Sequence, residues 1–370
     1  MRIAKDTVLG IIIFTFLIGC KETEISTLNE LYDAYSRRVS QIETLKYDAR
    51  WRITFPSGTE WDKTGTAILQ PIQSDTIFGF SFWGIRHDAN ESAIYKDGIG
   101  YHIINNDKQF IRENGGRHFL GRPGGNIVYG DYFKLDTIYK EAHFSSNDTA
   151  YVIDYKFEDI IEYGVTNRSK RVEISKDKLL PILIQSSRLP EVGERQTIKH
   201  EFHNLQVNTS DPDEINNYLI NLREYEQITY GEPQPNKILN TKSPPFRLQN
   251  IENKDQFITL TDNKLTLLDF WEIWCGPCIK SLPEIQRIDS VYRDDLNTIG
   301  IVAKDIDRAA QLINKRQIEF TNVIGTNEVS DAFSVNSWPR YFLIDKDGIV
   351  VNEYHGYSDQ IEKDILSRIK

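Results

Sequence analysis

Cysteine is scarce in this chain of 370 residues, which contains only Cys20, Cys275 and Cys278. A small secreted scaffold held together by disulfides would need more cysteines, in even number, so that class of protein is excluded. The single methionine is residue 1, which also excludes a methionine-rich surface for binding partner helices. Each of the three cysteines must therefore be accounted for separately.

The chain also lacks a long basic run. Its formal net charge is −10, with acidic and basic residues mixed along its length. We therefore expect no nucleic-acid partner. Hydrophobic residues make up 39% of the chain and charged residues 26%, values that exclude wholesale disorder. A length of 370 residues is too great for one ordinary domain, so we expect two folded units.

The N-terminus lacks an apolar run long enough to cross a bilayer comfortably. Arg2 and Lys5 precede the apolar residues 8–18, whereas a spanning helix needs about 20 apolar residues, which makes an uncleaved membrane helix the weaker interpretation. The segment Leu17-Ile18-Gly19-Cys20 resembles the lipobox of bacterial lipoproteins. This resemblance implies a signal peptide at 1–19, a lipidated Cys20 with a tether at 20–26, and a lipid anchor in the cell envelope of a bacterium, on the periplasmic or outer-membrane side.

Residues 27–225 form the first predicted domain, in which the spacing of hydrophobic residues changes once, from helical to alternating. Thr27 and Glu30 have the spacing of a capping box, and apolar residues follow at helical spacing, which predicts a helix over roughly 27–43. Alternating residues then predict strands near 45–53, 64–70, 76–83, 92–96, 100–104, 151–157, 169–174, 180–186 and 196–207, before a short closing helix that Asp211-Pro212 opens. This order predicts a β-rich antiparallel curved sheet or half-barrel with flanking helices, and it is similar to that of the periplasmic lipoprotein-carrier superfamily.

Three features of this domain have an ordinary structural interpretation. His200 and His203 lie three residues apart on a predicted strand, so their side chains face opposite sides and do not form a metal pair. The glycines between 115 and 125 lack the strand-to-helix context of a phosphate loop, and we expect a mobile loop between strands. We expect five aromatic residues in the core, namely Trp51, Phe78, Phe80, Phe82 and Trp83. The alternative is that they line a concave ligand-binding face.

A second domain is predicted at 243–370, after a proline-containing linker at 226–242. Residues 264–270 form a nearly continuous apolar strand, typical of the covered centre of a mixed sheet. Trp274-Cys275-Gly276-Pro277-Cys278 follows and leads into a predicted helix. A helix N-terminus stabilises a thiolate through its dipole and free amides, and two intervening residues bring the second sulfur within bonding reach of the first. The two cysteines of this motif are therefore a candidate redox pair.

A zinc site and a structural disulfide are the weaker interpretations of this cysteine pair. A zinc knuckle needs four ligands, and the sequence contains no second cysteine pair, so we expect no metal and no other cofactor. A purely structural disulfide between residues so close in sequence would close a very small loop and give little stabilisation.

Trp-Cys-Gly-Pro-Cys is the thioredoxin signature, and residues 243–370 resemble the TlpA/ResA-like thiol–disulfide oxidoreductases. This resemblance implies an α/β thioredoxin fold with Cys275 and Cys278 as catalytic residues. Asp269 has the position of the family's buried acid, which implies that it exchanges a proton with Cys278, its pKa raised by burial. The pair Trp338-Pro339 matches the cis-proline loop. The residues thereby implied in substrate binding are Trp274, Gly276, Pro277, Trp338 and Pro339.

The domain departs from the family pattern in two respects. Residue 338 is Trp where Thr or Val is usual, which predicts an aromatic wall beside the substrate. Ser281 and Gly276 stand where relatives dedicated to cytochrome c maturation carry Glu, so the sequence does not favour haem-protein maturation in particular. Pro283 matches the helix proline of the family.

The motif also predicts a direction of electron flow. In thioredoxin this motif accompanies a nucleophilic cysteine with a pKa of about 7 and a reduction potential of about −270 mV, which is strongly reducing. By that analogy we expect an enzyme that reduces or isomerises disulfides in protein substrates and is kept reduced by a membrane thiol donor. The alternative is an envelope ligand- or lipid-binding lipoprotein in which the redox domain is accessory.

Overall fold

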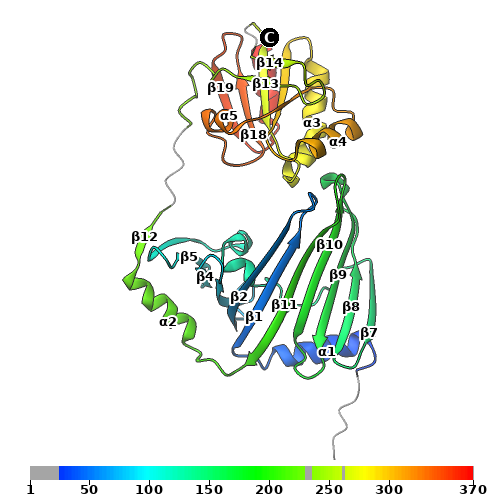
Figure 1. Cartoon of the computed structure of the whole chain (residues 1–370), viewed down its shortest axis with the longest axis vertical. Coiled ribbons are helices and arrows are strands. Elements are labelled where there is room, and N and C mark those ends of the chain that lie inside the picture. The colour runs from blue at the N-terminus through cyan, green and yellow to red at the C-terminus, as the bar shows by residue number, and fades with distance from the viewer. Residues whose placement is uncertain (1–24, 230–235, 261–262, 370) are drawn as a thin grey trace, which may run out of the picture.

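The computed structural model describes residues 25–229, 236–260 and 263–369. The predicted signal peptide, Cys20, most of the tether and part of the linker lie outside these residues. Figure 1 shows two domains, a large curved sheet and a smaller α/β domain. Within the described ranges, no helix is long and apolar enough to span a membrane. The predicted order of a β-rich domain followed by an α/β domain is confirmed.

The first domain is built on one twelve-stranded sheet with the order β12-β6-β5-β4-β3-β2-β1-β11-β10-β9-β8-β7. Neighbouring strands are antiparallel except for the pair of β12 and β6. The strands are β1 (Leu45–Thr54), β2 (Glu60–Pro71), β3 (Phe80–Arg86), β4 (Glu91–Lys96), β5 (Ile99–Ile104), β6 (Gln109–Asn114), β7 (Glu141–Ser146), β8 (Ala150–Lys156), β9 (Val165–Ser175), β10 (Pro181–Pro190), β11 (Gln196–Val207) and β12 (Glu226–Ile228).

The start of β3 differs from the sequence prediction. The strand was expected from residue 76, but it begins at Phe80. The carboxylate of Asp75 accepts hydrogen bonds from the amides of Ile77, Phe78 and Gly79, at 3.1, 2.7 and 2.9 Å. These bonds hold the segment as a turn, because a side-chain acceptor competes with the sheet for the same backbone donors.

Helix α1 (Leu28–Val39) has the predicted capping box at Thr27 and Glu30, and it buries Leu31 and Tyr35. These residues join an aromatic core on one face of the sheet, which contains Phe78, Phe80, Phe82, Tyr47 and Tyr132. The predicted core position of Phe78, Phe80 and Phe82 is therefore confirmed. Trp83 points to the other face, where it stacks on Tyr218 of helix α2 (Glu214–Asn221) with ring centroids 4.4 Å apart. Trp51 packs at the edge of the core and is half-buried.

The structure also shows where the histidine pair and the glycine segment of this domain lie. His200 is 7% exposed and His203 is exposed, so the two side chains do face opposite sides of β11. The glycine segment forms two short turns, η1 (Arg117–Gly121) and η2 (Gly125–Ile127). It packs against the sheet instead of projecting from it, since a Cβ at Gly84 would lie 2.5 Å from the carbonyl oxygen of Gly124.

The second domain has a five-stranded mixed sheet of order β17-β16-β15-β18-β19, in which all six residues of the central β15 are buried. Helices cover both faces of this sheet. The elements are β15 (Leu265–Phe270), α3 (Gly276–Tyr292), β16 (Leu296–Val302), α4 (Ile306–Arg316), β17 (Thr321–Ile324), α5 (Asn327–Ala332), β18 (Arg340–Ile344), β19 (Val350–His355) and α6 (Gln360–Ile369), preceded by the hairpin β13 (Arg247–Gln249) and β14 (Phe257–Thr259).

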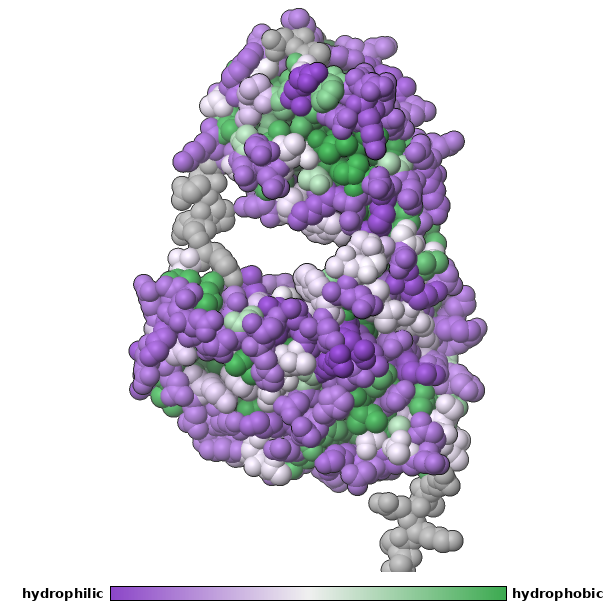
Figure 2. All heavy atoms as spheres, in the orientation of Figure 1, coloured by the Kyte–Doolittle hydropathy of each residue, from purple (hydrophilic) through white to green (hydrophobic). Residues whose placement is uncertain are grey.

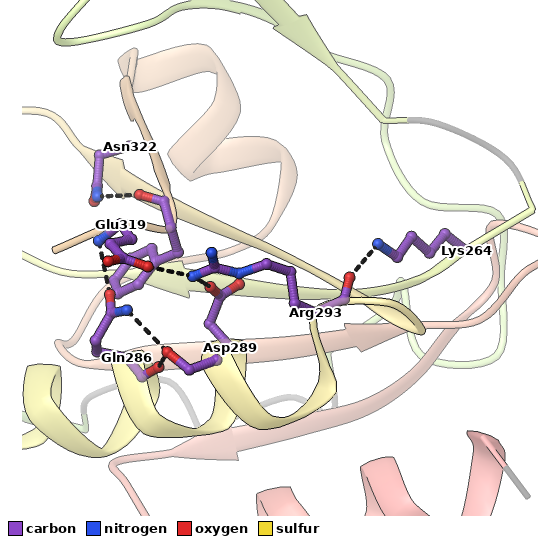
Figure 3. Close-up of polar contacts among 8 residues, drawn as sticks. Lys264, Gln286, Asp289, Arg293, Glu319 and Asn322 are labelled. Atoms are coloured by element: carbon purple, nitrogen blue, oxygen red, sulfur yellow. Dashed lines mark hydrogen bonds and ion pairs between the residues drawn. The ribbon is translucent and has the colours of Figure 1, made fainter.

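A polar network holds the C-terminal half of α3 in place (Figure 3). Arg293 pairs with Asp289 at 3.1 Å and with Glu319, before β17, at 2.6 Å. The side-chain oxygen of Gln286 accepts the amide of Glu319 at 2.8 Å, and Lys264 donates to the carbonyl oxygen of Arg293 at 2.6 Å. These contacts fix the helix against its neighbours, and thereby fix the direction in which its N-terminus points.

We predict that Phe82→Ala lowers the free energy of unfolding of the first domain by about 3–5 kcal/mol, because it opens a cavity among fully buried aromatic rings. Urea unfolding followed by fluorescence measures the change. Ile138→Ala is the matched control, since Ile138 is 88% exposed and its replacement should cost less than about 0.5 kcal/mol. Equal losses in the two variants would contradict the assignment of this core.

Candidate redox site

Cys275 and Cys278 form a disulfide with an S–S distance of 2.08 Å and a Cα–Cα distance of 5.2 Å. The pair lies where the central strand β15 gives way to helix α3. Cys275 is the N-cap of that helix, and its sulfur accepts a hydrogen bond from the amide of Cys278 at 3.2 Å. Cys275 is 5% exposed and Cys278 is fully buried. The helix N-terminus is thus directed at the sulfur of Cys275, which favours its thiolate form.

Asp269 lies on β15 and is 1% exposed. Neither carboxyl oxygen has a hydrogen-bond partner among the described residues. Burial raises the pKa of this carboxyl group to about 8, since the charged form loses its hydration without gaining a partner. The burial and the raised pKa were expected from the resemblance, because Asp269 has the position of the family's buried acid.

A chain of hydroxyl groups leads from the neighbour of Asp269 to the second cysteine. Tyr341 on β18 lies directly opposite Asp269 in the sheet. Its hydroxyl is 2.8 Å from that of Ser281, which donates to the carbonyl oxygen of Cys278 at 3.0 Å. Since directly opposed residues share a face of the sheet, the carboxyl group lies on the side that α3 covers.

Glu272 is a buried acid that the sequence analysis missed. It is 1% exposed, and its carboxylate accepts the amides of Ala303 and Lys304 at 3.0 and 3.1 Å. Its own carbonyl oxygen accepts the amide of Cys275 at 3.0 Å. Burial raises the pKa of this carboxyl group to about 7, against the lowering effect of the two amides. Glu272 therefore ties the segment after β16 to the redox motif.

The Trp338–Pro339 peptide bond is cis, as predicted. The indole ring of Trp338 meets that of Trp274 edge-to-face with centroids 5.4 Å apart, which brings the motif and the proline loop together. Arg340 is 4% exposed and donates to Asn336 and Ser337 at 3.0 and 2.7 Å, which holds this loop from behind. Of the remaining predicted binding residues, Pro277 is exposed and Gly276 is partly exposed beside the disulfide.

The first domain also reaches the site, which local sequence patterns could not predict. The ring of Tyr163 lies against the motif, so that a Cβ at Gly276 would be 3.3 Å from it. Lys280 of α3 pairs with Glu162 at 3.1 Å, and Arg316 of α4 pairs with Glu191 at 2.6 Å. In Figure 1 the turns at the ends of β9 and β10 extend to these helices, and Figure 2 shows the domains touching on that side.

No group of three or more His, Cys, Asp or Glu side chains that could hold a metal ion occurs in the parts of the chain that the structure describes.

Comparisons with known proteins agree with the geometry of the site. Residues 239–368 match the Redoxin family. Thiol-disulfide oxidoreductase ResA of Bacillus anthracis is 28% identical over 121 residues, covering 32% of this chain and 70% of that protein. Thioredoxin-like protein YneN of Bacillus subtilis (strain 168) is 20% identical over 132 residues, covering 35% and 78%. The crystal structure of StoA from Bacillus subtilis has 21% identity and a TM-score of 0.30, covering 32% of this chain and 95% of its own.

The family match spans the redox motif, the cis-proline loop and all five strands of the smaller sheet. It agrees with a fold in which a cysteine pair caps the helix that follows the central strand. Residues 239–368 are therefore a Redoxin domain similar to the TlpA/ResA-like thiol-disulfide oxidoreductases, and through this domain the chain is a thioredoxin-like oxidoreductase.

Proposed function

We propose that this protein reduces or isomerises disulfides in protein substrates by dithiol–disulfide exchange through Cys275 and Cys278. The observation that carries the proposal is the position of the Cys275 sulfur at the N-terminus of α3, bonded to the sulfur of Cys278. The helix terminus stabilises the thiolate of one residue, and the buried partner lies within bonding distance to release any captured substrate.

The exchange proceeds in two displacements. In the reduced enzyme the Cys275 thiolate attacks one sulfur of the substrate disulfide, that bond breaks, and the leaving sulfur takes up a proton. Cys278 then loses its proton and attacks the sulfur of Cys275, which releases the second substrate thiol. Two electrons pass to the substrate, and the enzyme is left with the disulfide seen here. A dithiol donor returns it to the reduced form.

Asp269 is proposed to carry the proton of Cys278 in the second displacement. It lies under α3 on the central strand, and burial raises its pKa to about 8. A carboxyl group with a pKa near the working pH can accept and return a proton, whereas an exposed aspartate would be ionised throughout. Its position beside Tyr341 puts it on the same side of the sheet as the second cysteine.

The cellular setting is proposed from the sequence. Cys20 would carry the lipid anchor, which places the enzyme in the cell envelope of a bacterium with a membrane thiol donor as the source of electrons. The thioredoxin-like Gly276-Pro277 pair supports the reducing direction. The alternative of a ligand- or lipid-binding lipoprotein gains no support from the first domain, because aromatic side chains fill the sheet face that α1 covers.

Two single replacements test the assignment of the two cysteines. Cys275→Ser should reduce insulin turnover with dithiothreitol to the uncatalysed rate, because it removes the attacking sulfur. Cys278→Ser should retain the first displacement and accumulate a mixed disulfide with the substrate, visible on a non-reducing gel. Turnover by Cys275→Ser at the wild-type rate would refute the assignment.

Asp269 also predicts a pH dependence of stability. The folded oxidised protein retains the proton of Asp269 up to about pH 8, whereas the unfolded chain loses it near the ordinary value of 3.8. The folded state thus binds more protons than the unfolded chain in this pH window. The contribution of the Asp269 carboxyl group to the free energy of unfolding therefore falls as pH rises, by about 1.4 kcal/mol per pH unit. We predict that Asp269→Asn removes this slope in urea unfolding between pH 4 and 8.

Asp295→Asn is the control for that experiment, because Asp295 is exposed in the same domain and its replacement should leave the slope unchanged. Identical pH profiles for the wild type and Asp269→Asn would show that this carboxyl group is ionised in the folded state, and would exclude it as the proton carrier.

A further inference from the structure

A groove of about 710 Å³ lies between the two domains, beside the redox motif. We call it the interdomain groove. The redox domain contributes Ile273, Trp274, Gly276, Ile279, Asp305 and Arg308 to its lining. The first domain contributes residues from the β1–β2 hairpin, from the η3 turn (Ile161–Tyr163) and its flanks, and from β10 and β11. Its size is that of a site for a few side chains of a ligand.

The groove presents two large aromatic side chains to solvent. Trp61, at the start of β2, is 48% exposed, and Trp274 in the motif is 53% exposed. Trp61 is nevertheless held in position, since its ring meets Phe55 and Trp51 edge-to-face with centroids 5.0 and 6.2 Å apart. A fixed and half-exposed indole loses little conformational entropy on binding, and such residues dominate the energy of polypeptide recognition.

The groove also contains an arginine that a ligand could neutralise. Arg188 on β10 donates to the neutral side-chain oxygen of Gln196 at 2.5 Å, and among the described residues it has no carboxylate partner. Arg188 is exposed at the groove surface, and partial loss of hydration together with the nearby charge of Arg168 lowers its pKa. Arg308, across the groove, is already paired with Asp305 at 3.1 Å. A carboxylate brought by a ligand would therefore meet Arg188.

The groove is continuous with the reacting cysteines. Trp274 precedes Cys275 directly, and its ring also contacts Trp338 of the cis-proline loop. Gly276, the residue after the attacking cysteine, lines the groove opposite Tyr163. A substrate chain whose cysteine is joined to Cys275 must therefore place its neighbouring residues along the motif and into this space.

We propose that the interdomain groove is a substrate subsite, in which the first domain binds the residues that flank the substrate cysteine. Its chemistry selects an aromatic side chain, against Trp61 and Trp274, together with a carboxylate, at Arg188. This inference rests on the proposed function, since it concerns the polypeptide that the redox pair attacks. It makes the first domain part of the enzyme's specificity.

Two peptide disulfides test the subsite with the full chain. One is the disulfide-linked dimer of acetylated and amidated Glu-Phe-Cys-Phe-Glu, and the other that of Gln-Gly-Cys-Gly-Gln, both reduced with dithiothreitol as donor. We expect kcat/KM to favour the Phe-Glu peptide by about tenfold in the wild type. Trp61→Ala should lower kcat/KM for the Phe-Glu peptide and so abolish most of the preference, while kcat/KM for the Gly-Gln peptide stays unchanged. Arg188→Gln should lower kcat/KM for the Phe-Glu peptide, which contains Glu, and leave that for the Gly-Gln peptide unchanged.

Two further variants keep the test decisive. Trp61→Phe retains an aromatic wall and should keep most of the preference, even if Trp61→Ala folds poorly. Tyr139→Ala removes an aromatic side chain of the same domain, 38% exposed and outside the groove lining, and should change neither rate. An unchanged preference in Trp61→Ala, with Gly-Gln turnover intact, overturns the subsite alone. Failure of the wild type to reduce either peptide overturns the proposed function instead.

Discussion

The hydrogen bond from the amide of Cys278 to the sulfur of Cys275 depends on the orientation of a single helix, and the chemistry of the site depends on that bond. Helix α3 points its N-terminus at the sulfur because its other end is held by ion pairs and hydrogen bonds to the segments before β15 and β17. The start of the motif is held in turn by Trp271, whose indole donates to Asn322 on β17 at 2.9 Å. A sulfur so placed is stabilised as a thiolate by the helix terminus itself.

The same helix joins the two domains. Its first turn packs against Tyr163, and Lys280 and the neighbouring helix α4 pair with Glu162 and Glu191 of the first domain. The side chains of the Arg316–Glu191 pair are only 15% and 20% exposed, so this contact is screened less by solvent than an ordinary surface ion pair. The large sheet therefore serves as a support that brings its hairpin and turns to the mouth of a small redox domain.

Local patterns were sufficient to predict much of this structure. The capping box at Thr27, the alternation in β1, the continuous apolar β15 and the strand–motif–helix order each depend on residues close in sequence. The positions of Trp61 in the interdomain groove and of Tyr163 against the motif were not predictable, because more than a hundred residues separate each from the motif and only the tertiary fold brings them together. Strand β7 was missed because its half-exposed, polar sequence alternates weakly. Glu272 was missed because its partners, two backbone amides, carry no sequence signal.

Activation of Cys275 by the helix N-terminus is tested most directly by alkylating the reduced protein with iodoacetamide as a function of pH and identifying the modified cysteines by peptide mass spectrometry. We predict that Cys275 reacts first, with an apparent pKa below that of a free thiol, while buried Cys278 is protected. Preferential modification of Cys278, or a Cys275 that reacts only with the pKa of an ordinary thiol, would contradict the claim that the helix N-terminus activates this sulfur.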